Sequence, residues 1–201
     1  GHYEAIRSLY DRVLILGQRE IFDPIEEYDF PRETREKVAF CGYLRKDIDP
    51  GHALEVRRSF AIGPEEKLLL VTPGGGEDGY LVIDTFLRAF PLMAAEVRPR
   101  VVIVSGPEMA TGEREGLKRR TWTLSGVTFL EFSGDMMGLM GASDGVISMG
   151  GYNTICEILS LRKRAIVIPR VRPTEEQLIR AERMAPLGLF GMIHQIGRAH
   201  V

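Results

Sequence analysis

Short apolar runs alternate along this chain with longer segments in which apolar residues recur at helical spacing. Runs of about four to six apolar residues are typical of buried parallel strands, and the segments between them are long enough for helices. The predicted strands are 12–16, 37–41, 67–71, 100–104, 127–130, 145–148 and 165–168; the predicted helices are 52–60, 80–90, 111–124, 135–140, 153–161 and 174–184. This alternation predicts an α/β fold with a doubly wound, Rossmann-like parallel sheet covered on both faces.

A polar stretch interrupts the pattern after the second strand and predicts a domain boundary. It ends in the turn-forming triplet Asp49-Pro50-Gly51, so we place the boundary near Leu44, with residues 1–44 and 45–195 in different domains. The chain has no initiator Met and residues 1–9 already have helical character. Its last six residues, 196–201, read I-G-R-A-H-V and match a translated sequencing adapter, so we treat them as non-native. We therefore expect a fragment of a longer protein.

Composition narrows the classes of partner. With 201 residues, a net charge of -2 and no dominant basic stripe, nucleic acid is not an expected partner. No apolar run approaches the roughly 20 residues of a membrane span. The two cysteines, Cys41 and Cys156, make no disulfide framework, so we expect reduced thiols and a cytoplasmic location.

The strongest candidate site begins where the strand 145–148 meets the next helix, in the sequence S-M-G-G-Y-N-T-I-C-E-I. Backbone N–H groups of Gly150 and Gly151 at a helix start, together with the helix dipole, suit a phosphate group. Glu157 follows Asn153 by four residues, so both face one side, and its carboxylate suits a ribose diol. The pattern predicts a nucleotide-diphosphate site, with an ordinary strand-to-helix turn as the alternative.

Two further loops follow strands and are expected at the same edge of the sheet. The first, T-P-G-G-G-E-D-G, carries Gly74, Gly75 and Gly76, which allow close approach of a ligand, although a surface turn would use the same residues. The second reads P-R-V-R-P-T-E-E-Q. Its cations are candidates for phosphates and its acidic and amide groups for sugar hydroxyls, and the residues concerned are Arg170, Arg172, Glu176 and Gln177.

Other features of this second loop and of the chain have simpler explanations. Thr174 and Gln177 fit a capping box at the start of the last helix. The D-x-D triplet 47–49 fits a turn better than a metal site. His52 and His194 lack the partner spacing of a metal site or a triad. Core packing accounts for Cys156 and for the methionines Met136, Met137 and Met140.

Taken together, these motifs resemble the C-terminal domain of GT-B glycosyltransferases, closest to the MurG-like transferases of glycosyltransferase family 28. The resemblance covers roughly residues 38–188: F-C-G-Y-L-R resembles the interdomain strand and linker, E-F-S-G-D-M the base-binding segment, and S-D-G-V-I-S-M-G-G-Y-N-T-I-C-E-I the family signature. It implies that residues 1–44 are the tail of an N-terminal acceptor domain and that residues 45–195 bind the nucleotide sugar.

The resemblance also implies roles for single residues. Backbone near Phe132 and Ser133 would hold the uracil edge, Thr154 and neighbouring amides would meet the diphosphate, and Glu157 the ribose. Glu176 and Gln177 would contact the donor sugar. The chain departs from the MurG-like pattern in having Glu176-Gln177 in place of paired glutamines, and T-P-G-G-G-E-D-G in place of G-G-S-x-G.

The implied function is transfer of a hexosyl group from a UDP-sugar, UDP-N-acetylglucosamine-like, to an acceptor hydroxyl of unknown identity. Helix N-terminal amides would stabilise the leaving UDP, so no metal or other cofactor is expected. The catalytic base would come from the missing N-terminal domain, so the fragment would bind donor without turnover, and any peripheral membrane association would also reside there. A UDP-sugar 2-epimerase and a non-catalytic nucleotide-sugar-binding module are the alternatives; a dehydrogenase would need a dinucleotide fingerprint, which is missing.

Overall fold

The structure is a computed structural model that describes residues 2–194. The six-residue tail 196–201, expected to be non-native, lies outside the described residues. The chain divides into two compact units, residues 1–45 and residues 46–201. Within residues 2–194, no helix has both the length and the apolar character needed to cross a membrane.

The smaller unit is built on two short parallel strands, β1 (Val13–Ile15) and β2 (Val38–Phe40). Its helices are α1 (His2–Leu9), α2 (Pro24–Glu27) and α3 (Arg32–Arg35). The connection between β1 and β2 holds two one-turn helices, α2 and α3. The first of them is capped by the Asp23 carboxylate, which accepts a hydrogen bond from the Ile25 N–H. Lys37 donates to three backbone carbonyls at the end of α1, those of Ile6, Arg7 and Tyr10, and so ties that helix to β2.

The larger unit contains a six-stranded sheet whose neighbouring strands are all parallel, in the order β5-β4-β3-β6-β7-β8. The strands are β3 (Leu68–Thr72), β4 (Arg100–Val104), β5 (Val127–Leu130), β6 (Gly145–Ser148), β7 (Arg164–Val167) and β8 (Gly191–Met192). From β3 the chain adds β4 and β5 on one side, then returns and adds β6, β7 and β8 on the other. The predicted doubly wound sheet is confirmed, and β8, a strand of two residues, is the member that the pattern did not predict.

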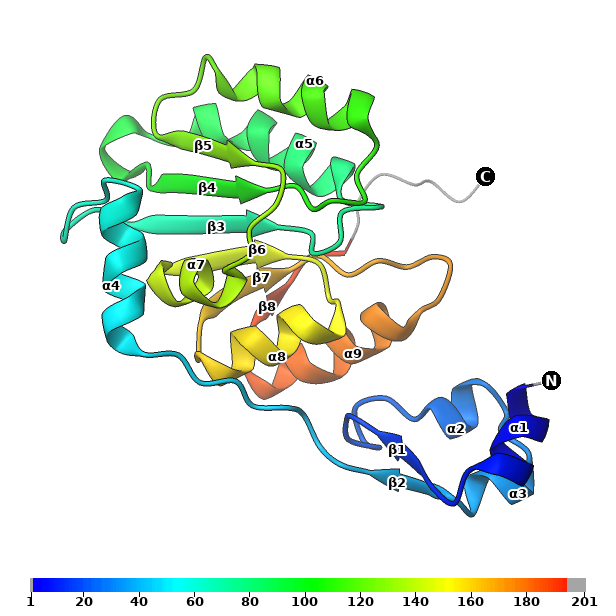
Figure 1. Cartoon of the computed structure of the whole chain (residues 1–201). Coiled ribbons are helices and arrows are strands. Elements are labelled where there is room, and N and C mark those ends of the chain that lie inside the picture. The colour runs from blue at the N-terminus through cyan, green and yellow to red at the C-terminus, as the bar shows by residue number, and fades with distance from the viewer. Residues whose placement is uncertain (1, 195–201) are drawn as a thin grey trace. The chain divides into compact units, whose positions relative to one another are not determined.

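Helices cover both faces of this sheet (Figure 1). Helices α5 and α6 pack together on one face; α7 packs against α4, α8 and β3 on the other. The bounds are α4 (Pro50–Ser59), α5 (Tyr80–Ala89), α6 (Thr111–Thr121), α7 (Met136–Ala142), α8 (Tyr152–Ser160) and α9 (Glu176–Met184), with 3₁₀ turns at Phe90–Leu92, Ala95–Val97 and Ala185–Leu187. The Asp49 carboxylate accepts a hydrogen bond from Gly51 N–H, so the D-x-D triplet serves as a helix cap.

The core explains why the central strands are apolar throughout. Strands β3 and β4 are buried on both faces, and Leu70, Val71 and Ile103 have no exposed surface. Val71 and Ile103 pack into one apolar cluster with Ile83 of α5 and with Phe90, just beyond the end of that helix. Burying several such side chains, at about 1.5–3 kcal/mol each, makes the sheet the rigid base on which the loops rest.

The last helix differs from its prediction. A capping box was predicted at Thr174, but α9 begins at Glu176, and its N-cap residue, Glu175, accepts no side-chain cap hydrogen bond. Gln177, the expected partner of Thr174, instead accepts a hydrogen bond from the Arg170 N–H through its Oε1 at 3.1 Å. The capping interpretation was therefore wrong, because the Gln177 side chain bonds to the Arg170 N–H in the preceding loop and not to the helix end.

Candidate functional site

The winding of the sheet reverses between β3 and β6, and the site lies there. Thr72 and Ser148, the last residues of these strands, are register partners. Since β3 leads to a helix on one face and β6 to a helix on the other, their outgoing loops diverge and leave a crevice. The loop 73–79 borders one side of the crevice and the turn 149–151 the other.

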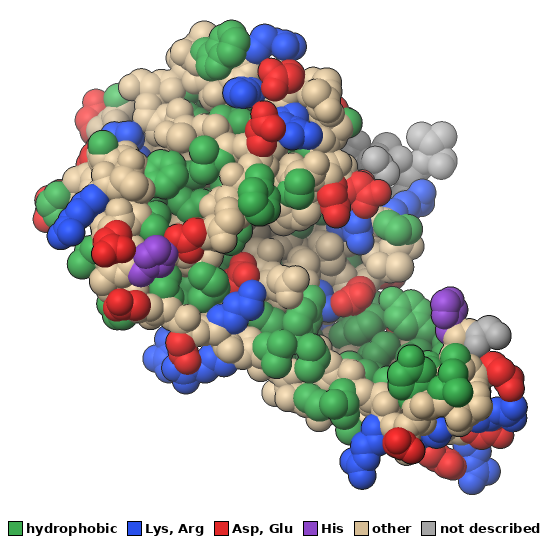
Figure 2. Space-filling view, viewed as in Figure 1, with side chains coloured by type: hydrophobic (Ala, Val, Ile, Leu, Met, Phe, Trp, Pro, Cys, Tyr) green, Lys and Arg blue, Asp and Glu red, His purple; other side chains and the backbone are tan. Residues whose placement is uncertain are grey.

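The crevice holds a cavity of about 440 Å³, a size that suits a small organic ligand. Figure 2 shows a hollow on this face of the larger unit, with acidic side chains near its rim. Gly150, Arg172 and Glu176 do not line this cavity. The other predicted site residues do: Gly74, Gly75, Gly76, Phe132, Ser133, Gly151, Asn153, Thr154, Glu157, Arg170 and Gln177. The sequence therefore located one shared pocket from loops far apart in the chain.

The glycine-rich loop is shaped by backbone that other residues rarely adopt. Gly74 and Gly76 have φ of 90° and 103°. A Cβ on Gly76 would lie 2.3 Å from the Ser105 backbone oxygen, and one on Gly74 would lie 3.7 Å from Thr154 Oγ1. Glycine is required at Gly76 because the loop folds directly onto the end of β4. This close packing brings the loop beside the start of α8.

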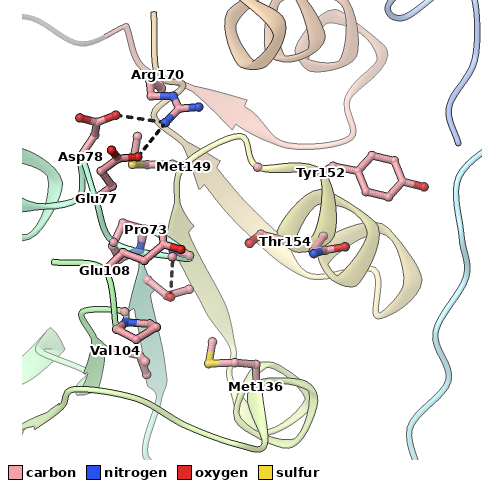
Figure 3. Close-up of a pocket in the computed structure, with 18 of the residues that line it drawn as sticks. Pro73, Glu77, Asp78, Val104, Glu108, Met136, Met149, Tyr152, Thr154 and Arg170 are labelled. Atoms are coloured by element: carbon pink, nitrogen blue, oxygen red, sulfur yellow. Dashed lines mark hydrogen bonds and ion pairs between the residues drawn. The ribbon is translucent and has the colours of Figure 1, made fainter. Parts of the chain in front are cut away.

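Helix α8 directs its N-terminus at the cavity. Its N-cap residue, Gly151, provides no side-chain cap hydrogen bond, so the first turn keeps N–H groups without an intrahelical acceptor. Gly151, Asn153 and Thr154 all line the cavity, and Figure 3 shows Thr154 on the helix facing the loop that carries Pro73. The N–H groups and the helix dipole make this end a favourable place for an anion.

Glu157 lies one turn deeper in α8 and is largely buried, with 12% of its side chain exposed. Its Oε1 is 2.7 Å from the Lys46 Nζ, which belongs to the segment before α4. The Lys46 backbone N–H also donates to Ser160 Oγ, so the lysine is anchored to the same helix at two points. The carboxylate is thereby oriented by a cation that sequence reasoning did not identify.

Phe132 and Ser133 form the opposite wall, after β5. The Phe132 side chain is 65% exposed, an unusual state for a phenylalanine that lines a cavity. Ser133 Oγ accepts from the Asp135 N–H, and the Asp135 carboxylate caps α7 through the Gly138 N–H. Met136, expected only as a core residue, also lines the cavity.

His52 supports this wall from α4. Its Nε2 is 2.7 Å from Asp135 Oδ2, and its Nδ1 is 3.4 Å from Glu55 Oε2. The hydrogen bond with Asp135, followed by that with Glu55, raises the pKa of His52 above its ordinary value. His52 is therefore paired with Asp135 and Glu55, although the sequence showed no spacing typical of a metal site or a catalytic triad around it.

Arg170 borders the cavity from the β7–α9 loop and is held by the glycine-rich loop. Its Nη1 lies 3.1 Å from Asp78 Oδ2 and 3.9 Å from Glu77 Oε2 (Figure 3). Arg172, the second candidate for phosphate binding, does not line this cavity. The arginine thus crosses the crevice and joins its two sides.

Glu176 is the predicted residue whose placement needs correction. Its carboxylate pairs with Arg180, four residues along α9, and it does not line the cavity. Gly150 is likewise absent from the lining because its carbonyl turns toward Arg180, which donates to it at 2.9 Å. The i,i+4 spacing of Glu176 and Arg180 is a sequence signal that could have revealed this pair.

Carboxylates outnumber cations around the cavity. Glu77, Asp78, Glu108 and Glu157 line it together with one arginine. Within residues 2–194, no group of three or more His, Cys, Asp and Glu side chains could hold a metal ion. The groups in the lining that could attract an anion are the glycine-loop amides, the α8 N-terminus and Arg170.

The family model for the glycosyltransferase family 28 C-terminal domain matches residues 74–196, more than half of the chain. The chain belongs to this family. The match includes the glycine-rich loop from Gly74 onward, α8 and the β7–α9 loop, so all of the cavity lining except Thr72 and Pro73 lies within it. The family and the fold that the sequence resembled are thus confirmed.

Curated relatives and solved structures agree with this assignment. The chain is 30% identical over 143 residues to the UDP-N-acetylglucosamine--N-acetylmuramyl-(pentapeptide) pyrophosphoryl-undecaprenol N-acetylglucosamine transferase of Fusobacterium nucleatum, covering 70% of this chain and 38% of that protein. It is 27% identical over 188 residues to an uncharacterized glycosyltransferase of Methanopyrus kandleri, covering 92% and 49%. The crystal structure of Acinetobacter baumannii MurG has a TM-score of 0.60 at 13% identity, covering 98% of this chain and 51% of that one, which shows the shared fold. The chain spans about half or less of each of these proteins.

Proposed function

We propose that residues 46–194 bind the UDP portion of a nucleotide-sugar donor in the cavity between β3 and β6, as the donor half of a glycosyltransferase. The single observation that carries the proposal is the convergence of a glycine-rich loop, a helix N-terminus and an oriented carboxylate on one cavity. Each part suits a different portion of the ligand. The amides at the start of α8 suit the diphosphate, and Glu157 suits the ribose diol.

The base and the sugar have candidate contacts on either side. The exposed ring of Phe132 and the neighbouring backbone are proposed to meet the uracil, and Gln177 the donor sugar. The donor is proposed to be UDP-N-acetylglucosamine or a close analogue, because that donor appears in the name of the Fusobacterium nucleatum relative. Glu176 is removed from the proposed sugar contacts because Arg180 holds it.

The proposed reaction is a direct displacement. An acceptor hydroxyl attacks the anomeric carbon, the bond from that carbon to the diphosphate oxygen breaks, and UDP leaves with the electron pair. Amide N–H groups aimed at the diphosphate would stabilise its growing charge without rearranging. The hydroxyl proton passes to a base that we place outside this chain, so this chain by itself is expected to bind donor without turnover.

Ligand-dependent melting of the 201-residue chain tests the donor assignment. UDP, UDP-N-acetylglucosamine, UDP-glucose and NAD are compared, and a ligand at one hundred times its dissociation constant adds about 2.7 kcal/mol of stability. We expect uridine nucleotides to raise the melting temperature and NAD to leave it unchanged. A cooperative melt that no uridine nucleotide shifts would remove the proposal.

The ribose contact needs a sharper test because Glu157 is also paired with Lys46. The affinities for UDP and 2′-deoxy-UDP are compared in the wild type and in Glu157→Gln. The wild type should prefer UDP, and the variant should lose most of that preference because an amide oxygen is a weaker acceptor than a carboxylate. Equal affinity of the wild type for both nucleotides would show that Glu157 does not read the ribose.

A further inference from the structure

Arg180 is a buried arginine behind the cavity, on the inner side of α9. It is 3% exposed, and its Nη1 donates to the Gly150 carbonyl at 2.9 Å. Its Nη2 pairs with the Glu176 carboxylate, and its guanidinium carbon lies 5.9 Å from the centre of the Tyr152 ring. The guanidinium therefore contacts both sides of the turn that leads into α8.

Stability alone is a weak explanation for such a residue. Burying a guanidinium costs much of what its ion pair returns, and an apolar side chain of similar volume often stabilises a core equally well. The pairing is also incomplete, because within the described residues the buried Nε of Arg180 has no hydrogen-bond partner. A guanidinium at position 180 is better explained by its effect on the groups that it contacts, such as the Gly150 carbonyl.

We propose that Arg180 is a positioning residue that fixes and polarises the peptide between Gly150 and Gly151 for binding the donor diphosphate. This inference rests on the proposed function. Among the described residues the only cis peptide precedes Pro173, so the Gly150–Gly151 peptide is trans and its C=O and N–H point in opposite directions. With the carbonyl held by Arg180, the Gly151 N–H points away from the guanidinium, and we infer that it faces the cavity that Gly151 lines.

The hydrogen bond also strengthens the donor at the other end of the same peptide. A carbonyl that accepts from a cation draws electron density from its amide, so the N–H becomes a stronger donor to an anion. The turn packs closely on α9, since a Cβ added to Gly150 would lie 3.3 Å from the Gln177 backbone oxygen and Cβ. Arg180 thus acts through Gly151 and needs no contact with the ligand.

Glu176 acquires a different role in this arrangement. Its carboxylate lies on the guanidinium and offsets part of the charge that Arg180 places behind the diphosphate site. Replacing it with glutamine leaves the Arg180–Gly150 hydrogen bond possible while removing the opposing charge. Glu176→Gln should therefore bind UDP several-fold more tightly, with unchanged affinity for uridine.

The test measures affinities for uridine and UDP by calorimetry in the 201-residue chain, so that the diphosphate contribution is their ratio. Arg180→Met should lower that ratio about tenfold or more, as expected for a charge-assisted hydrogen bond, with little effect on uridine. Arg180→Lys, which keeps a cationic donor, should recover part of the loss. Arg183→Met removes the same charge from an exposed position on the same helix and should leave the ratio unchanged.

The outcomes separate the two proposals. If the wild type binds no uridine nucleotide, both the donor site and the role of Arg180 are wrong. If the wild type binds UDP but Arg180→Met loses uridine and UDP affinity equally, or neither, Arg180 has only a structural role. Should Arg180→Met fail to fold, Glu176→Gln decides the question, because a lowered or unchanged UDP-to-uridine ratio in that variant contradicts the proposal.

Discussion

The Nζ of Lys46 lies 2.7 Å from Oε1 of Glu157, and this pair joins the segment before α4 to the second half of α8. The carboxylate is largely enclosed, whereas the lysine is 40% exposed. A single enclosed carboxylate at this depth would be costly without a partner. The pair therefore ties the segment before α4 to α8 and fixes the direction in which the Glu157 carboxylate faces the cavity.

Lys46→Met should lower the free energy of unfolding by about 1–2 kcal/mol, because Glu157 keeps its enclosed position and loses its cation. Urea denaturation measures the change. Lys67→Met serves as the comparison: it removes a lysine paired at 3.1 Å with Asp144, but that lysine is 74% exposed. A surface pair of this kind is worth about 0–1 kcal/mol, so equal losses in both variants would contradict the special position of Lys46.

Gly76 provides a second test, of the loop geometry. Gly76→Ala should destabilise the protein by more than about 1 kcal/mol and weaken UDP binding, since φ is 103° and the new Cβ would meet the Ser105 oxygen. Gly116→Ala is the matched control, within α6 and with nothing within 4 Å of its Cβ position. It should instead stabilise by about 0.5–1 kcal/mol. Thermal and urea denaturation of both variants checks the opposite signs, and destabilisation by both would refute this account.

The fold was predictable because its strands are short apolar runs, and the central strands β3 and β4 are buried on both faces. Strands such as β4 and β5 stand where the apolar runs placed them, at Arg100–Val104 and Val127–Leu130. The exceptions are short elements: β8 has two residues, too few for any periodicity, and α2 has four. Some helix ends also differ from the prediction. Helix α6 was predicted to reach residue 124 but ends at Thr121, because Gly126 and the residues before it form the turn into β5.

The cavity was predictable because parallel strands bring their outgoing loops to one edge, whatever their distance in sequence. The pairing of side chains that are far apart in the sequence was not predictable. Lys46 and Glu157 are 111 positions apart, and His52 and Asp135 are 83 apart, with no local pattern to join them. Glu176 was assigned to the sugar because adjacent acidic and amide groups suit hydroxyls; its actual partner, Arg180, lies on the same helix and satisfies the carboxylate first.

The pH dependence of stability should report on the His52–Asp135 hydrogen bond. The pKa of His52 is raised in the folded protein by Asp135 and Glu55, so its protonated form stabilises the fold. That contribution is fully present below the unfolded pKa of about 6.5 and is lost as pH rises through the folded value. Melting temperatures from pH 5 to pH 9 should therefore differ most between wild type and His52→Gln at the acidic end. A difference that grows toward alkaline pH would have the wrong sign for this pair.

Asp78 should oppose donor binding, because it competes with the diphosphate for Arg170. The two side chains are 3.1 Å apart and partly exposed, so the pair itself is weak. Asp78→Asn removes the nearer of the two carboxylates beside the guanidinium, leaving Glu77 at 3.9 Å, and so removes a negative charge from the cavity wall. The affinity for UDP should therefore rise about two- to fivefold at low ionic strength. The gain should shrink near 1 M salt, where screening is strong.

The control is Glu65→Gln, which removes an exposed carboxylate outside the cavity lining and should leave the affinity for UDP unchanged. Weaker UDP binding in Asp78→Asn would instead mean that Asp78 holds Arg170 in its binding position.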